Sequence, residues 1–85
     1  MPANVTMYAT RFCPYCMRAR SLLKKKGIEF EEIAVSSGNG LWREMAEKSG
    51  RNTVPQIFID GESVGGYDDI AALNQQGKLD QKLGI

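Results

Sequence analysis

The first 35 residues show a strand pattern, a helix pattern and a second strand pattern, and this order restricts the fold more than any other feature. Residues 4–9 (NVTMYA) are short and apolar-rich, as in a strand. The helix pattern begins at Pro14, which suits the first helical position, and ends before Gly27, which suits a helix C-terminus. Residues 28–35 (IEFEEIAV) then alternate as in a second strand. A strand, a crossover helix and a strand predict a right-handed unit with two parallel strands.

The second half of the chain predicts two more strands and two more helices. Asp60-Gly61 is a dipeptide typical of a tight β-hairpin turn, so the two strands on either side of it should be antiparallel. The strands are expected at 56–60 and 63–65 and the helices at 41–50 and 68–77, with a final helical turn at 78–83. The order is β-α-β-α-β-β-α. We expect one α/β domain, residues 1–85, with a four-stranded mixed sheet and helices on both faces.

The composition argues against several classes of partner. The net charge is +1, so no strong positive surface is expected to attract nucleic acid or an anionic membrane. No segment approaches the roughly 20 apolar residues that span a bilayer, and the first residues lack the features of a signal peptide. A secreted domain this small usually carries about two to four disulfides, whereas this chain has two cysteines in all. We therefore expect a cytoplasmic protein that binds neither nucleic acid nor membrane.

Cys13 and Cys16 are separated by two residues at the start of the first expected helix. Such a pair can be a structural disulfide, part of a metal site, or a redox centre that forms and breaks its own disulfide. Zinc takes about four ligands, usually Cys or His, and the chain has no His and no further Cys. A disulfide that closes so short a loop stabilises little, and cytosolic disulfides are seldom structural. These considerations favour the redox role.

Three motifs together resemble one family. The sequence CPYC at 13–16, TVPQIFIDG at 53–61 and GGYDD at 65–69 resembles the dithiol glutaredoxins, most nearly the small bacterial type. The resemblance covers almost the whole chain and implies a thioredoxin fold with glutathione-dependent thiol–disulfide exchange. It implies glutathione as the reducing co-substrate, no resident metal, a monomer, and partners that are disulfide-containing or glutathionylated proteins. Among such partners, the family resemblance also points to ribonucleotide reductase.

The position of the two cysteines on the helix predicts different roles for them. Cys13 would lie at the helix N-terminus, where unpaired N–H groups stabilise a thiolate, the form that attacks. A helix dipole contributes about 0.3–1 kcal/mol, less than the roughly 2 kcal/mol that half ionisation at pH 7 requires. Arg11 and direct N–H to sulfur hydrogen bonds are the candidates for the remainder. Cys16 lies deeper in the helix and should be the less ionised, resolving thiol.

The resemblance also implies a glutathione-binding set. Arg11 is placed to meet the glycyl carboxylate with help from Arg43, Tyr15 would line the groove, and a cis Pro55 would present the Val54 backbone to the peptide. Glycine at 65 and 66 allows close approach of the backbone, and the N-terminus of the last long helix suits the γ-glutamyl carboxylate. The predicted residues are Arg11, Tyr15, Arg43, Thr53, Val54, Pro55, Gly66, Asp68 and Asp69.

Each assignment has a plainer alternative, and the function has two. The arginines and Tyr15 could be solvated surface side chains, Pro55 could simply open an edge strand, and Asp68 and Asp69 could be ordinary N-capping residues. Instead of the oxidoreductase, two chains could hold a [2Fe–2S] cluster through Cys13 and glutathione, although Pro14 argues against it. A thioredoxin-like protein reduced by a flavoenzyme is the other alternative. The sequence departs from many relatives at Tyr67, where they have a third cysteine.

Overall fold

A computed structural model describes residues 3–36 and 38–85, and its elements follow the predicted order. The elements are β1 (Val5–Ala9), α1 (Pro14–Lys25), β2 (Phe30–Ala34), α2 (Leu41–Ser49), β3 (Gln56–Ile59), β4 (Glu62–Gly65), α3 (Tyr67–Gln75) and α4 (Leu79–Leu83). The final turn expected at 78–83 is therefore a separate short helix. At the hairpin, Asp60 and Gly61 both have positive φ, +52° and +82°, as a two-residue turn that matches the strand twist requires.

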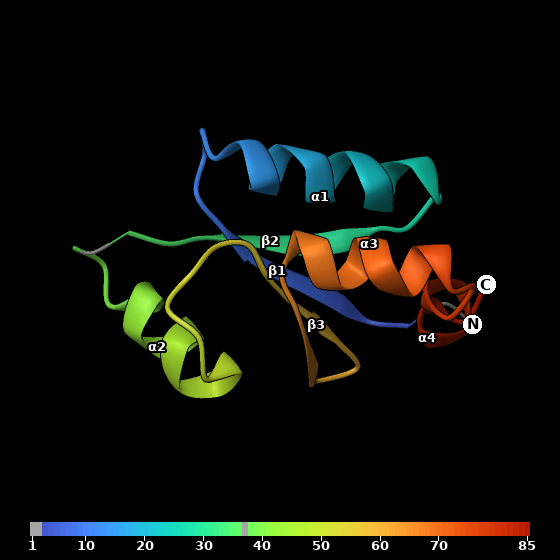
Figure 1. Ribbon diagram of the computed structural model, residues 1–85. Coiled ribbons are helices and arrows are strands. Elements are labelled where there is room, and N and C mark those ends of the chain that lie inside the picture. Colours follow the sequence, from blue (N-terminus) through green and yellow to red (C-terminus); the bar gives the residue numbers. More distant parts are fainter. Residues whose placement is uncertain (1–2, 37) are drawn as a thin grey trace.

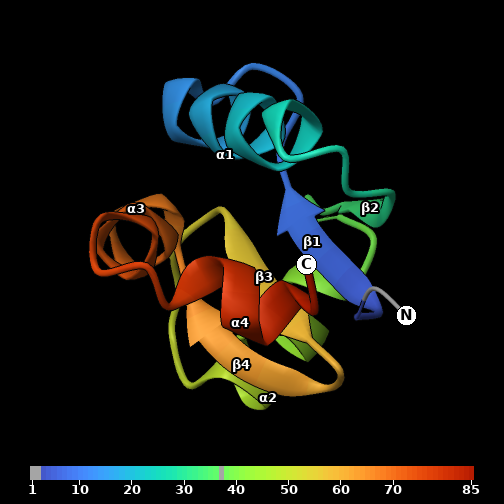
Figure 2. The same ribbon diagram turned by 90° about the vertical axis from the view of Figure 1, so that its right-hand side faces the viewer.

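The four strands form one mixed sheet in the order β2-β1-β3-β4. β1 pairs in parallel with β2, with Val5 opposite Phe30, and pairs antiparallel with β3, which pairs antiparallel with β4. Helices α1 and α3 cover one face of the sheet and α2 covers the other (Figures 1 and 2). The prediction of a four-stranded mixed sheet between helices is confirmed.

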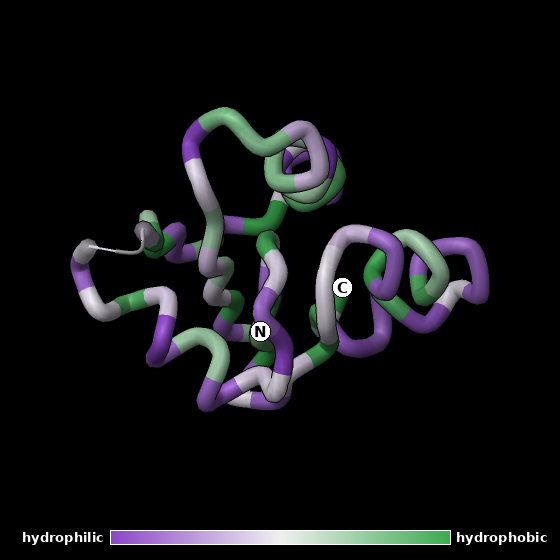
Figure 3. The backbone as a smooth tube through the Cα atoms, turned by 60° about the vertical axis from the view of Figure 1, so that its left-hand side comes forward, coloured by the Kyte–Doolittle hydropathy of each residue, from purple (hydrophilic) through white to green (hydrophobic). Residues whose placement is uncertain are grey.

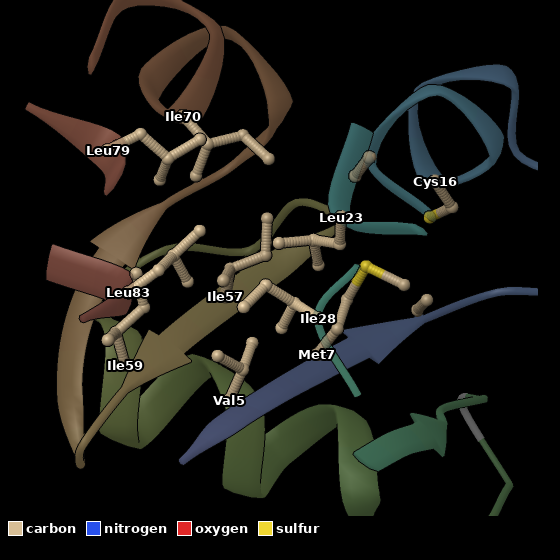
Figure 4. Packing of buried hydrophobic residues seen from close by; sticks show 12 residues of the cluster. Val5, Met7, Cys16, Leu23, Ile28, Ile57, Ile59, Ile70, Leu79 and Leu83 are labelled. Atoms are coloured by element: carbon tan, nitrogen blue, oxygen red, sulfur yellow. The ribbon is translucent and has the colours of Figure 1, made fainter. Parts of the chain in front are cut away.

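Alternate residues of the central strands supply two cores, one on each face of the sheet. Met7 of β1 and Leu23 of α1 are fully buried in the larger core, under α1, α3 and α4 (Figure 4). Tyr8 and Phe58 point to the other face and pack with Met45 of α2. Full burial of one such side chain contributes about 1.5–3 kcal/mol, so both helical layers are held firmly to the sheet. Figure 3 shows apolar segments mainly in the middle of the molecule and hydrophilic segments mainly outside.

The start and end of α1 place Cys13 at the tip of a well-anchored helix. Cys13 is the N-cap, with an extended backbone (φ −74°, ψ 124°), and Pro14 occupies the first helical position. No side chain caps this end, so the first N–H groups of the helix remain available to a ligand or to the cysteine sulfur. At the other end Gly27 has a φ of +72° and terminates the helix, as the sequence predicts. No helix within the described ranges is long and apolar enough to cross a membrane.

Candidate active site

The Cys13 thiol lies half-buried at the N-terminus of α1 and is free. Partial burial opposes its ionisation and is the largest single influence on its pKa. The pKa of Cys13 is nevertheless held below its ordinary value, because other influences outweigh that burial. These are hydrogen bonds from the Cys16 N–H, the Cys16 thiol and the Tyr15 N–H, and the charge of Arg20. The direction of this pKa shift is the one that N–H groups directed at the sulfur produce at a helix N-terminus. A lowered pKa increases the thiolate fraction at neutral pH, which is the nucleophilic form.

Cys16 is fully buried beneath Cys13 and points from α1 toward the sheet (Figure 4). Burial is the main cause that raises the pKa of Cys16, and the neighbouring Cys13 sulfur raises it further. The two thiols thus have pKa values shifted in opposite directions, although only two residues separate them. This difference matches the predicted division between an attacking thiol at Cys13 and a protonated, resolving thiol at Cys16.

Arg20 is a cation whose charge lowers the pKa of Cys13. Arg20 lies one turn beyond Cys16 on α1 and donates two hydrogen bonds to the Glu32 carboxylate, at 2.6 and 2.7 Å, and one to the Thr10 carbonyl, at 3.2 Å. These three bonds fix a guanidinium near the thiols. Arg11 is exposed, with its guanidinium over the Phe12 ring at 5.6 Å. Arg11 is closer to Cys13 in sequence, but the positive charge that lowers the pKa of Cys13 is that of Arg20.

Replacement of Arg20 by glutamine is expected to raise the pKa of Cys13, because the positive charge that favours the thiolate is removed. The thiolate can be titrated by its ultraviolet absorbance. The midpoint of the Arg20→Gln variant should lie above that of the parent protein. Arg18→Gln is the matched control, since Arg18 is on the same helix but is exposed, with its guanidinium over the Tyr15 ring at 5.5 Å. An unchanged midpoint in Arg20→Gln, or an equal change in both variants, would contradict the role of Arg20.

A pocket of about 350 Å³ opens beside Cys13, within the range of small-molecule sites. Its wall includes the segment that precedes β3, where the Val54–Pro55 peptide bond is cis, as predicted. The Cys13 sulfur lies 4.0 Å from the Val54 carbonyl oxygen, which places the thiol at the edge of the pocket. The pocket is lined by Tyr15, Arg51, Thr53, Val54, Pro55, Gly66, Tyr67, Asp68 and Asp69.

Seven of the predicted glutathione-binding residues line this one pocket, although they come from three separate parts of the sequence. They are Tyr15, Thr53, Val54, Pro55, Gly66, Asp68 and Asp69. Arg11 and Arg43 do not line it. Arg43 lies on α2, on the opposite face of the sheet from α1, with its side chain 86 % exposed and paired to Glu47 at 3.3 Å. The structure thus separates Arg43 from the other predicted residues.

Asp69, which lines the pocket, packs against the backbone of Gly65 and Gly66 at the start of α3. The Asp69 carboxylate accepts hydrogen bonds from the Gly66 N–H, at 2.9 Å, and from Arg51, at 2.7 Å. A Cβ on Gly65 would lie 2.3 Å from the same carboxylate, and Gly65 has a φ of +100°. Glycine at 65 is therefore required for close approach of the backbone to Asp69, rather than to a ligand as the sequence suggested. Asp69, at the third position of α3, thus caps the helix through the Gly66 N–H and also lines the pocket, whereas Asp68 is exposed at the pocket rim.

The pairing with Arg51 is expected to make stability depend on pH through Asp69. Arg51, followed by the Gly66 N–H, holds the pKa of Asp69 below its value in the unfolded chain. The resulting stabilisation is complete above the unfolded pKa, near 3.8, and is lost as the pH falls through the lower folded pKa. The pair is partly exposed, so we expect Asp69→Asn to lower the free energy of unfolding by about 0.2–1 kcal/mol at pH 7.

Urea denaturation at neutral and acidic pH measures this effect. The difference between the parent protein and Asp69→Asn should shrink as the pH falls below 3.8. Asp68→Asn is the control, because Asp68 is the adjacent residue and makes no salt bridge in the described parts of the chain. A difference that stays constant or widens in acid would contradict the ion pair.

Sequence reasoning missed Arg20, Arg51 and the position of Tyr67 in the pocket wall. The spacing of Arg20 from Cys16, four residues along the same helix, was a signal that could have placed it beside the thiols. Arg51 stands two residues before Thr53 in the same motif region, but its partner Asp69 is 18 residues away, so the pairing required the fold. Tyr67 was considered only as the replacement of a cysteine.

The mixed sheet between helices, with a cysteine pair at the N-terminus of α1, defines a thioredoxin-fold protein with a redox-active dithiol. The cis-proline segment beside the cysteine pair agrees with this class. A family model described as Glutaredoxin matches residues 5–64. The chain is 48 % identical to Glutaredoxin 3 of Escherichia coli K12 over 95 % of this chain and 98 % of that one. It is 51 % identical to a glutaredoxin of Pseudomonas aeruginosa over 93 % of this chain and 94 % of that one. The chain belongs to the glutaredoxin family, whose members are glutathione-linked thiol oxidoreductases.

Solved structures agree with this assignment. A crystal structure of a buckwheat glutaredoxin–glutathione complex superposes with a TM-score of 0.87 at 27 % identity, over 96 % of this chain and 77 % of that chain. A solution structure of glutaredoxin from Brucella melitensis gives a TM-score of 0.84 at 52 % identity, over 96 % of this chain and 89 % of that chain. The resemblance found in the sequence motifs is therefore confirmed for family and fold.

Proposed function

We propose that this protein is a glutathione-dependent oxidoreductase that reduces protein disulfides and glutathione mixed disulfides through Cys13 and Cys16. The observation that carries the proposal is the position of Cys13: its sulfur is 4.0 Å from the Val54 carbonyl, at the edge of a pocket built from distant segments. A thiolate at the edge of a peptide-sized pocket is suited to exchange with a peptide thiol. That a buckwheat neighbour is a complex with glutathione supports the choice of peptide.

The pocket offers complementary groups to each part of glutathione. The backbone of Val54 would pair with the cysteinyl residue, as in the addition of a short strand. The first N–H groups of α3 would bind the γ-glutamyl carboxylate, since the N-terminus of a nine-residue helix favours anions. Asp69 is already paired with Arg51, so the exposed carboxylate of Asp68 is the group we assign to the γ-glutamyl ammonium. Tyr15 would cover the side of the groove nearest the thiol.

Deglutathionylation would require Cys13 alone. The Cys13 thiolate attacks the glutathione sulfur of a protein–glutathione mixed disulfide, the sulfur–sulfur bond breaks, and the protein thiolate leaves and takes up a proton. A second glutathione thiolate then attacks the glutathionyl sulfur on Cys13. This step forms oxidised glutathione and releases Cys13 as a thiolate, a good leaving group because its pKa is lowered.

Reduction of a protein disulfide would require both cysteines. Cys13 attacks one sulfur of the substrate and forms a mixed disulfide, and Cys16 then attacks the Cys13 sulfur. The substrate leaves as a dithiol, and the Cys13–Cys16 disulfide is reduced by two glutathione molecules, which become one molecule of oxidised glutathione. Cys16 must lose its proton for this step, and burial raises its pKa, which favours the protonated thiol in the resting protein.

We further propose a monomer that acts in the cytoplasm on disulfide-containing or glutathionylated proteins. Ribonucleotide reductase, which oxidises its own thiols in each turnover, is a substrate of the right chemical kind. The test of the proposed function is turnover of a small glutathione mixed disulfide in the presence of glutathione, glutathione reductase and NADPH, with NADPH oxidation as the readout. Saturable, enzyme-dependent NADPH oxidation is expected. A rate equal to that of glutathione alone would reject the proposal.

A further inference from the structure

A net charge near zero conceals a strong separation of charge along this chain. Six Lys and Arg residues and no Asp or Glu precede Glu29, whereas the remaining five Lys and Arg accompany all ten Asp and Glu. The basic part includes the whole of α1, whose N-terminus carries Cys13. The reactive thiol therefore lies at one end of a helix that has only basic and neutral side chains.

A shallow groove of about 570 Å³ runs along the exposed side of α1 and is lined by Met17, Arg20, Ser21, Lys24 and Lys25. Met17, Ser21 and Lys24 follow Cys13 at intervals of four, four and three residues, so they form a stripe along one face of the helix. The lining of the groove begins at Met17, four residues beyond Cys13 on the same helix, and shares no residue with the pocket proposed for glutathione.

The described residues pair only one of the three cations that line this groove. The guanidinium of Arg20 is bound to Glu32. No salt bridge within residues 3–36 and 38–85 involves Lys24 or Lys25, and both residues are exposed. Two lysine ammonium groups at the far end of the groove are therefore available to an external partner.

The end of the groove near Cys13 is apolar. Phe12 is 83 % exposed and Met17 is 56 % exposed, on either side of Cys13 in the sequence. Large apolar side chains exposed together next to a reactive group are a feature of protein-binding surfaces. The surface beside Cys13 therefore has an apolar part next to the thiol and a cationic part farther along α1.

We propose that the groove along α1 binds acidic residues that flank the reacting cysteine of a protein substrate. This inference rests on the proposed function, since it concerns the substrates of the same thiol. Lys24 is eleven residues beyond Cys13, about 16 Å along a helix, which an extended peptide spans in about five residues. Substrates with Asp or Glu about three to five residues from the reacting cysteine fit best, with an apolar residue between.

The experiment compares two glutathionylated peptides with one cysteine each. One has Asp at the third to fifth positions on both sides of the cysteine, and the other has Asn at those positions. We expect kcat/KM to be about three- to tenfold higher for the Asp peptide, because two exposed ion pairs each contribute modestly. In Lys24→Gln/Lys25→Gln the ratio should fall close to one. In Lys78→Gln/Lys82→Gln, which removes the same charge from α4, the ratio should be retained.

The outcomes separate the two proposals. Turnover of the Asn peptide tests the proposed function, and the ratio between peptides tests the groove. The proposal that the groove binds acidic residues would be overturned by equal kcat/KM for both peptides. Equal loss of the preference for the Asp peptide in both double variants would also overturn it. If neither peptide is turned over, binding of the reduced Asp peptide to Cys13→Ser decides the matter by amide chemical shifts. The proposed binding role of the groove is supported if the Asp peptide, but not the Asn peptide, shifts the amide signals of Met17, Ser21, Lys24 and Lys25. The absence of these shifts overturns it.

Discussion

Cys13→Ser is expected to reduce turnover of glutathione mixed disulfides to the uncatalysed background, a loss on the order of 1,000-fold or more. The hydroxyl of serine is a far weaker nucleophile than the thiolate at this helix N-terminus, whose pKa the Cys16 and Tyr15 N–H groups lower. No other residue can replace Cys13, because Cys16, the second of the chain's two cysteines, is fully buried. The glutathione-coupled assay measures the loss directly.

Cys16→Ser is the matched comparison, since it removes one sulfur from the same helix. The variant should still remove glutathione from mixed disulfides, because that reaction uses Cys13 alone. It should fail to release protein disulfide substrates, which require the second thiol, and should accumulate as a mixed disulfide that mass spectrometry detects. Activity that persists in Cys13→Ser, or full dithiol activity in Cys16→Ser, would contradict the assigned roles.

The fold could be predicted from the sequence because local signals and the overall topology agree. Pro14 and Gly27 mark the ends of α1, and Asp60-Gly61 adopts the positive φ values of its turn. The short apolar-rich run at 4–9 predicts a strand, and the structure divides the apolar residues of β1 between two cores. Each of these signals depends on residues close together in the sequence, which is why element boundaries were also nearly correct.

The site was predicted less completely because its side-chain partners are distant in sequence. The bond between Arg51 and Asp69 spans 18 residues, and the bonds between Arg20 and Glu32 span 12. Proximity in sequence makes Arg11 a candidate for the activating cation, whereas in the fold its guanidinium lies over the Phe12 ring. Motif resemblance located the pocket, whereas the electrostatics within it depend on which charged groups the fold brings together.

Gly65→Ala is expected to have a large effect on stability, at the residue that precedes the pocket-lining Gly66. Alanine is strained at a φ of +100°, and its Cβ would lie 2.3 Å from the Asp69 carboxylate oxygen. The carboxylate must then move away from the Gly66 N–H and Arg51, which removes the cap of α3. Backbone strain and loss of the cap together should lower the free energy of unfolding by about 2–4 kcal/mol, measured by urea denaturation.

Gly27→Ala separates the two causes, because Gly27 has a φ of +72° but no atom within 4 Å of the added Cβ. It should therefore show only the backbone strain, about 1–2 kcal/mol. The difference between the variants reports the collision with Asp69, and it should be accompanied by a higher KM for glutathione in Gly65→Ala alone, since the N-terminus of α3 forms part of the pocket. If Gly65→Ala lowers the free energy of unfolding no more than Gly27→Ala does, and leaves the KM for glutathione unchanged, the contact between Gly65 and Asp69 does not organise the pocket.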